Sequence, residues 1–185
     1  MLKLLFIDLL ITTGVSFAKD DSACWYYSTA KNEEVHEGQC LNFYNEKPQP
    51  DFAGDALVSK KVAIDLDYDG DGLAYLRTRD GFLYVNSQGY ARQVISYDNG
   101  PDYFAAGLAR TRQNGKIGYF DKSLKMVIAP AYDFGFPFSE GRAIVCNGCV
   151  EQQKGEHKIM VGGLWGAIVH AIRYSSGQIR KLVKD

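Results

Sequence analysis

The chain repeats one short phrase three times. The stretch DGLAYLRTRDGFLYV is followed by AGLARTRQNGKIGYF, and a fainter third copy opens with EGRAIV. The glycines that head the three copies, Gly72, Gly107 and Gly141, are 35 and 34 residues apart. Repeats at such a period indicate small units that cannot bury enough apolar surface alone and gain stability by stacking on one another. The repeat therefore predicts an array of similar modules packed into one domain.

The middle copy has the sequence pattern of a β-meander. Residues 108–112 are expected to form a strand, and Asn114-Gly115 offers two positive φ angles for a two-residue hairpin turn. Residues 116–120 then form the return strand, and residues 126–128 form a third strand that Pro130 ends. The sequence thus predicts an all-β fold of antiparallel hairpin and meander repeats.

The other copies are expected to use the same chemistry. Asp80-Gly81 is predicted to form the hairpin turn of the first copy. After its third strand the middle copy continues as AYDFGFPFSEG, which carries aromatic rings at alternate positions. An extended backbone places alternate side chains on one face. We expect that face to form the core between neighbouring copies, with these rings: Tyr132, Phe134, Phe136 and Phe138.

The composition agrees with a folded β protein. Hydrophobic residues make up 46% of the 185-residue chain and charged residues 23%, which are ordinary values for a globular domain. The chain contains 19 Gly, 12 Tyr and 10 Phe residues, a bias that favours strands joined by tight turns. The net charge of -1 provides no electrostatic attraction to nucleic acid or to an anionic membrane. We therefore expect no nucleic-acid partner.

The first 18 residues are predicted to be a secretory signal peptide. Lys3 supplies the positive start, residues 4–15 form a short apolar run that Asp8 interrupts, and Ser16-Phe17-Ala18 is a small-residue cleavage site. The run is too short for a transmembrane helix, which needs about 20 apolar residues. Cleavage after Ala18 would leave a periplasmic or secreted protein without a transmembrane segment. The alternative is an amphipathic first helix of a cytoplasmic protein.

The cysteine count agrees with export. The four cysteines can form two disulfides in three connectivities, and an even number is typical of an oxidising compartment. We favour the pairing that is local in sequence, Cys24–Cys40 and Cys146–Cys149. The first bridge would staple residues 19–70, a segment outside the repeats that is expected to cap one end of the array.

The repeated phrases resemble the WG repeat family of bacterial proteins. The resemblance rests on GLARTRQNGKIGYFDKSLKMVIAPAYDFGFPFSEGRAIV and GGLWGAIV, and it covers about residues 71–179 as units 71–105, 106–139 and 140–179. The Trp-Gly pair occurs literally at Trp165-Gly166, and Ile117-Gly118 and Phe82-Leu83 hold its place in the other copies. After Ile168 the usual turn is replaced, so a short helix is an alternative there, before a tail at 180–185. The resemblance implies a β-rich interaction surface without assigned chemistry.

The stretch VCNGCVEQQKGEHKIMVGG is inserted into the third copy and allows three interpretations. A redox Cys-x-x-Cys pair would need a helix N-terminus to stabilise the thiolate, and Gly155 interrupts the candidate helix. Cys146, Cys149 and His157 could bind zinc with His170 or His36 as a fourth ligand. The third interpretation, which we favour, is a disulfide that pins a surface loop.

The stretch DLDYDGDG is a candidate calcium loop. Asp65, Asp67 and Asp69 stand at alternate positions, and Gly70 follows where an EF-hand turns sharply. Leu76 occupies the twelfth position, where an EF-hand needs a bidentate acid. A solvated acidic turn that leads into the first copy is therefore the favoured interpretation of residues 65–71.

No catalytic constellation is evident in the sequence. The histidines have no partner motif for a nucleophilic serine, and no glycine-rich phosphate loop precedes a helix. We therefore expect a non-enzymatic binding or scaffolding protein of the cell envelope, without a cofactor, whose ligand is a protein or a glycan. The alternative is a metal- or thiol-dependent envelope enzyme centred on Cys146, Cys149 and His157. The aromatic residues that could stack on a sugar ring are Trp165, Tyr75, Tyr90 and Tyr103.

Overall fold

The computed structural model describes residues 22–43, 55–171 and 180–181. The predicted signal peptide lies outside these residues. The described part of the chain is all-β, with one short helix, α1 (Lys60–Ala63), and antiparallel sheets built from hairpins. The predicted fold class is confirmed.

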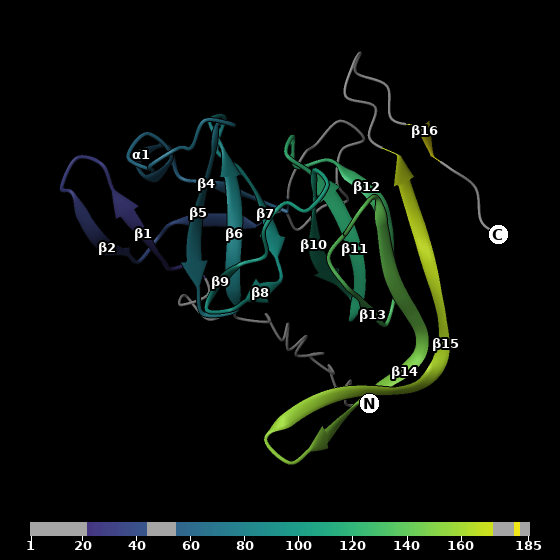
Figure 1. Ribbon diagram of the computed structural model, residues 1–185. Helices are drawn as coiled ribbons and strands as arrows, with labels where there is room; N and C mark the ends of the chain where they lie inside the picture. Colours follow the sequence, from purple (N-terminus) through teal and green to yellow (C-terminus); the bar gives the residue numbers. More distant parts are fainter. Residues whose placement is uncertain (1–21, 44–54, 172–179, 182–185) are drawn as a thin grey trace, which may run out of the picture.

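The N-terminal half of the molecule is a seven-stranded antiparallel sheet in the order β2-β1-β5-β6-β7-β4-β3. Strands β5, β6 and β7 come from the first copy of the repeat. The strands before them flank this meander on both sides and, together with α1, cap one end of the structure (Figure 1). The strands are β1 (Cys24–Ser28), β2 (Glu33–Glu37), β3 (Leu41–Phe43), β4 (Ala56–Val58), β5 (Leu73–Thr78), β6 (Gly81–Asn86) and β7 (Tyr90–Val94).

The C-terminal half contains the second and third copies. A small hairpin leads into a three-stranded meander, β10-β11-β12, and then into a sheet in the order β13-β14-β15-β16. Strands β14 and β15 form a long hairpin that curves away from the rest of the molecule (Figure 1). The strands are β8 (Ser96–Tyr97), β9 (Gly100–Pro101), β10 (Leu108–Gln113), β11 (Lys116–Asp121), β12 (Met126–Tyr132), β13 (Phe134–Gly135), β14 (Arg142–Lys154), β15 (His157–Ala171) and β16 (Arg180–Lys181).

The second and third copies begin with the same tight turn. Ala105 and Leu108 exchange two backbone hydrogen bonds of 2.9 and 3.1 Å, and Ser139 and Arg142 exchange two of 2.7 and 2.9 Å. In both turns the two central residues have positive φ, and the second of them is the heading glycine. The heading glycines of these two copies therefore occupy equivalent positions in the fold.

The two-residue hairpin turn is confirmed in the middle copy and differs in the first. Asn114 and Gly115 have φ of 49° and 78°, as a type I′ turn requires. In the first copy Thr78 pairs with Gly81, so the loop consists of Arg79 and Asp80. The prediction of a turn at Asp80-Gly81 was wrong by one residue, because Gly81 already belongs to the return strand.

Pro130 does not end the third strand of the middle copy, contrary to the prediction. Strand β12 continues to Tyr132, and the register between β11 and β12 shifts around Gly118, which marks a bulge. Proline is tolerated here because β12 is the edge strand of its sheet and Pro130 lies at the bulge. A Cβ atom on Gly118 would lie 2.7 Å from the carbonyl oxygen of Ile128, so the bulge needs glycine there.

Three apolar clusters join successive layers of the structure. The first cluster lies between the capping segment and the first copy, the second between the first and second copies, and the third between the second and third copies. The middle hairpin is consequently buried on both faces, as expected for stacked modules. Representative buried members of the three clusters are Leu66 and Leu76, Leu73 and Phe120, and Leu108 and Val145.

The four alternating rings do not share one buried face, so that prediction was wrong. Phe138 is buried, whereas Phe136 is 48% exposed and the other two rings are half-buried. The alternation fails because the chain changes sheets: Tyr132 pairs with Ile117 of the second copy, and Phe134 pairs with Cys146 of the third.

Both predicted disulfides are present. Cys24 is bonded to Cys40, with both residues fully buried, and Cys146 is bonded to Cys149. Two disulfides fit a periplasmic or secreted protein, because the cytosol keeps thiols reduced. Among the described residues, no helix combines the length and the apolar character needed to cross a membrane.

Candidate functional site

The face of the N-terminal sheet opposite the first apolar cluster carries an open cleft of about 470 Å³. It lies over strands β1, β2, β5 and β6, and the turn between β8 and β9 contributes one residue. Aromatic and charged side chains alternate around it. The lining residues are Trp25, Tyr26, Tyr27, Glu34, Asp67, Tyr75, Arg77, Phe82 and Asn99.

The two-residue period of the strands places the cleft side chains outside. In β1 the side chains of Cys24 and Tyr26 are buried in the first apolar cluster, so Trp25 and Tyr27 point to the opposite face. In β5 the alternation is the same, and Arg77 stands directly across from Trp25 in the paired strand. The capping segment and the first copy thus build the cleft together.

Arg77, which lines the cleft, contacts two neighbours. Its guanidinium carbon lies 5.3 Å from the centre of the Trp25 ring, a cation–π distance. One of its Nη atoms lies 3.5 Å from a carboxylate oxygen of Glu34. The other side of Trp25 is occupied by His36, whose ring centroid is 4.7 Å away. Trp25 therefore acts as a support for Arg77, which keeps free donors for a ligand.

Tyr75 provides the accessible aromatic surface. Its side chain is 55% exposed, and Phe82 contacts it edge-to-face with ring centroids 6.1 Å apart. Such a contact fixes the orientation of the ring and leaves a face open to solvent. Tyr27 adds a second exposed ring, with its hydroxyl donating to Asn32 at 2.8 Å.

The polar rim of the cleft offers both hydrogen-bond donors and acceptors. Glu34 and Asp67 accept hydrogen bonds, Arg77 donates them, and Asn99 does both. Two carboxylates oppose one guanidinium, so the lining carries a small excess of negative charge. An open ring face beside several hydrogen-bonding groups suits a ligand with an apolar face and a polar edge.

The four aromatic residues predicted to bind a sugar do not come together. Tyr75 lies in the cleft, Tyr90 is half-buried in β7, and Tyr103 packs edge-to-face on Tyr97 with centroids 5.5 Å apart. Trp165 lies on the hairpin of the third copy, where its indole N–H donates to the carbonyl of Gly162 at 2.9 Å.

The residues proposed for a metal or thiol site are also separated. Cys146 and Cys149 are joined in a disulfide within strand β14, where no helix precedes or follows them. His157 pairs with Lys154 at the tip of the hairpin. Lys154 is five residues beyond Cys149, which is roughly 17 Å along the strand. No described group of three His, Cys, Asp or Glu residues is arranged to hold a metal ion.

Two carboxylates of the acidic stretch at residues 65–71, Asp65 and Asp69, accept hydrogen bonds from the protein itself. Asp65 accepts hydrogen bonds from the Ser28 hydroxyl at 2.7 Å and from the Ala30 amide at 2.8 Å. Asp69 accepts from the amides of Asp71 and Leu73, which closes the turn before β5. These contacts fit the interpretation of the stretch as an acidic turn.

The contacts of Asp65 predict an acid-dependent contribution to stability. The hydrogen bonds from Ser28 and then Ala30 hold the pKa of Asp65 below its ordinary value of 3.8. A carboxyl whose pKa is lower in the folded state stabilises the fold above the unfolded pKa, and this contribution is lost as the pH falls through the folded pKa. We expect Asp65→Asn to reduce the loss of stability between about pH 4 and about pH 2. Urea unfolding midpoints across this range measure it, and profiles parallel to the wild type would contradict it.

Sequence reasoning missed Trp25, Glu34 and Arg77. The signal that could have found the first of them is the alternation within CWYYS, where one buried cysteine fixes which neighbours face outward. The other two depend on which strands pair, and no sequence pattern shows that β1 lies between β2 and β5.

Comparison with known proteins agrees with the resemblance. Residues 117–148 match the model of the family described as "WG containing repeat". The matched segment runs from the return strand of the middle copy to the disulfide of the third. No curated protein and no solved structure gives a significant match. The prediction of WG-type repeats is confirmed for this part of the chain.

Proposed function

We propose that this chain is a non-enzymatic binding protein of the cell envelope that holds a neutral glycan in the aromatic cleft. The observation that carries the proposal is the exposed ring of Tyr75 beside the Arg77–Glu34 pair. A sugar ring presents C–H groups on its faces and hydroxyls at its edge, so it can stack on Tyr75 while its hydroxyls bond to the charged pair.

The charge of the cleft favours a neutral sugar over an acidic one. Glu34 and Asp67 would repel a uronic acid or a phosphorylated sugar, and only Arg77 among the lining residues would attract it. The two disulfides support a location outside the cytoplasm. The WG repeat match at residues 117–148 is compatible with a repeat-based binding protein.

Fluorescence can test glycan binding directly. The chain has two tryptophans, so Trp165→Phe leaves Trp25, at the floor of the cleft, as the single reporter. In this background we expect neutral hexose or N-acetylhexosamine oligomers to change the Trp25 emission and uronic acid oligomers to bind more weakly. We expect Tyr75→Ala to weaken binding at least about tenfold, or about 1.4 kcal/mol.

The matched control is Tyr103→Ala. Tyr103 is 51% exposed, close to the value of Tyr75, and lies outside the cleft. It should therefore leave the affinity unchanged. If no neutral oligomer alters the emission, or if both tyrosine variants weaken binding equally, the cleft is not the glycan site.

A further inference from the structure

Each copy of the repeat turns one face to the copy before it and the other to the copy after it. In β10, Ala109 lies in the apolar cluster shared with the first copy, and the adjacent Leu108 lies in the cluster shared with the third. In β14, Ala143 lies in that latter cluster, so the third copy also packs backward on the second. The opposite side of β14 is the side on which a further copy would stack.

That opposite side exposes a group of apolar side chains beside Arg142, and no described residue covers them. Four of its side chains are exposed by 45% to 48%, although each is a large hydrophobic residue. Phe134 joins them, with its ring centroid 4.9 Å from that of Phe136 and 6.2 Å from that of Trp165. We call this surface the open face. It consists of Phe134, Phe136, Ile144, Trp165 and Val169.

The open face is apolar at positions where the covered copy is charged. Asp102 and Arg110 stand five residues before and three residues after Gly107, the heading glycine of the second copy, and they form a buried ion pair bonded to Gly135 of β13. At the same offsets from Gly141, the heading glycine of the third copy, stand Phe136 and Ile144, both exposed. Exposed apolar groups at a stacking position indicate a surface that another protein covers.

The opposite end of the stack determines how a second copy can bind. The back face of the first copy is covered by the capping segment, whose Tyr26, Val62 and Leu66 pack against Leu76. Within the described residues, a second chain therefore offers no free backward face on which the open face could stack head to tail. The apolar stacking surface that it offers is its own open face, and pairing of like surfaces gives a two-fold symmetric dimer.

The long hairpin adds a second reason for a partner. Residues 150–158 of β14 and β15 are all exposed, and this end of the ribbon curves away from the molecule (Figure 1). A two-stranded ribbon without a packed face is only marginally stable in water. Val150 is 62% exposed on this ribbon, so a partner at the open face would also find apolar surface there.

We propose that the open face binds a second copy of this chain and forms a symmetric dimer through the third repeats. Each chain contributes Ile144 and Trp165 to the centre of the interface, and Arg142 lies beside them in β14. The cleft at the capped end stays outside this interface, so a dimer would display two clefts at its two ends.

Light scattering on the full chain tests the proposal. We expect the wild type to show twice the mass of one chain at about 100 μM and to dissociate on dilution, because symmetric associations follow mass action. Ile144→Glu places two like charges at the centre of the interface and should raise the dissociation constant at least tenfold. Ile64→Glu makes the same substitution at a residue that is 75% exposed at the capped end, and it should leave the dimer intact.

A second measurement does not depend on how Ile144→Glu folds. Trp25→Phe leaves Trp165 as the single tryptophan, 45% exposed in one chain. Its emission should shift to the blue as the protein concentration rises through the dimer transition. A wild-type chain that stays monomeric over this range overturns the proposal, whether another part of the chain or a different protein covers the open face.

Discussion

Replacing Arg110 with alanine is expected to destabilise the protein by about 3–5 kcal/mol, because the change leaves a buried carboxylate without its counter-ion. The side chains of Asp102 and Arg110 are 1% and 8% exposed. Against a total stability of about 5–15 kcal/mol, a loss of this size removes a large fraction. Urea unfolding followed by circular dichroism measures it.

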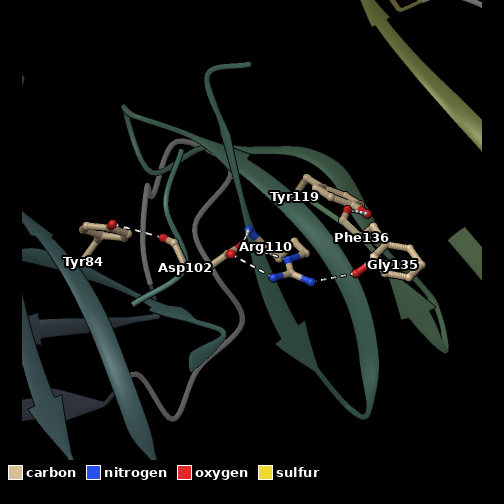
Figure 2. Close-up of polar contacts among 6 residues, drawn as sticks. All are labelled: Tyr84, Asp102, Arg110, Tyr119, Gly135 and Phe136. Atoms are coloured by element: carbon tan, nitrogen blue, oxygen red, sulfur yellow. Dashed lines mark hydrogen bonds and ion pairs between the residues drawn. The ribbon is translucent and has the colours of Figure 1, made fainter. Parts of the chain in front are cut away.

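The geometry explains why the loss should be large. Arg110 donates from Nε and Nη2 to the two carboxylate oxygens of Asp102, each at 2.8 Å, and its backbone N–H donates to the same carboxylate at 3.0 Å. Its Nη1 donates to the carbonyl of Gly135 at 3.0 Å, so the pair is tied to β13, the strand that pairs with β14 of the third copy (Figure 2). Bidentate pairing with satisfied neighbours makes a buried ion pair strong and makes its breakage costly.

Two tyrosines extend the same network on either side of the pair. Tyr84 of the first copy donates to the carbonyl of Asp102 at 3.1 Å, and Tyr119 donates to the carbonyl of Phe136 at 2.9 Å (Figure 2). Burial raises the pKa of Tyr84 to about 12 and also raises the pKa of Tyr119, so both hydroxyls stay protonated and remain donors. Polar groups of the first and second copies are thereby joined to strand β13, which pairs with β14 of the third copy.

A double-mutant cycle separates the ion pair from general damage. Asp102→Leu and Arg110→Met should each cost several kcal/mol, whereas the double variant should recover a large part, because no charge then remains buried. The recovery is incomplete, since the bonds to Gly135 and to the Arg110 amide are lost. As a control, Glu151→Ala breaks an exposed pair with Lys158 and should cost less than about 1 kcal/mol. Additive losses in the cycle would contradict the prediction.

The repeat was readable in the sequence because each module follows local rules. The heading turns, the Asn114-Gly115 hairpin and the two short-range disulfides all depend on residues close together in the chain. The bulge at Pro130 could not be predicted from the sequence, because a proline is tolerated within this strand only if β12 is the edge strand. Edge or centre is a property of the assembled sheet, and a single segment does not encode it.

Neither the cleft nor the ion pair was predicted, because both depend on how distant segments pack in the assembled fold. Trp25 and Arg77 are 52 positions apart and become neighbours only when β1 pairs with β5. Asp102 and Arg110 are eight residues apart, but the environment of the pair includes Gly135 of β13, which is 25 residues beyond Arg110. The alternation of side chains shows which residues share a face of one strand. It does not show which other element packs against that face.

Removing the Cys24–Cys40 disulfide is expected to destabilise the capping segment and to abolish glycan binding in the cleft. The bridge closes a loop with a sequence separation of 16, for which loss of the cross-link costs about 3 kcal/mol. Both cysteines are fully buried against Tyr26 and Leu41, so replacing them with alanine also removes apolar contacts.

Glycan binding should be lost when the capping segment is destabilised, because β1 carries part of the cleft. Trp25 and Tyr27 follow Cys24 directly in this strand, and Trp25 is the support on which Arg77 rests. The double variant Cys24→Ala/Cys40→Ala should therefore unfold at a lower urea concentration and lose the response of Trp25 to neutral oligomers. The matched variant Cys146→Ala/Cys149→Ala opens a loop with a separation of only 3, so it should cost less, about 2 kcal/mol, and leave binding intact. Equal losses from the two double variants, or binding that survives the first, would show that the cap does not depend on its disulfide.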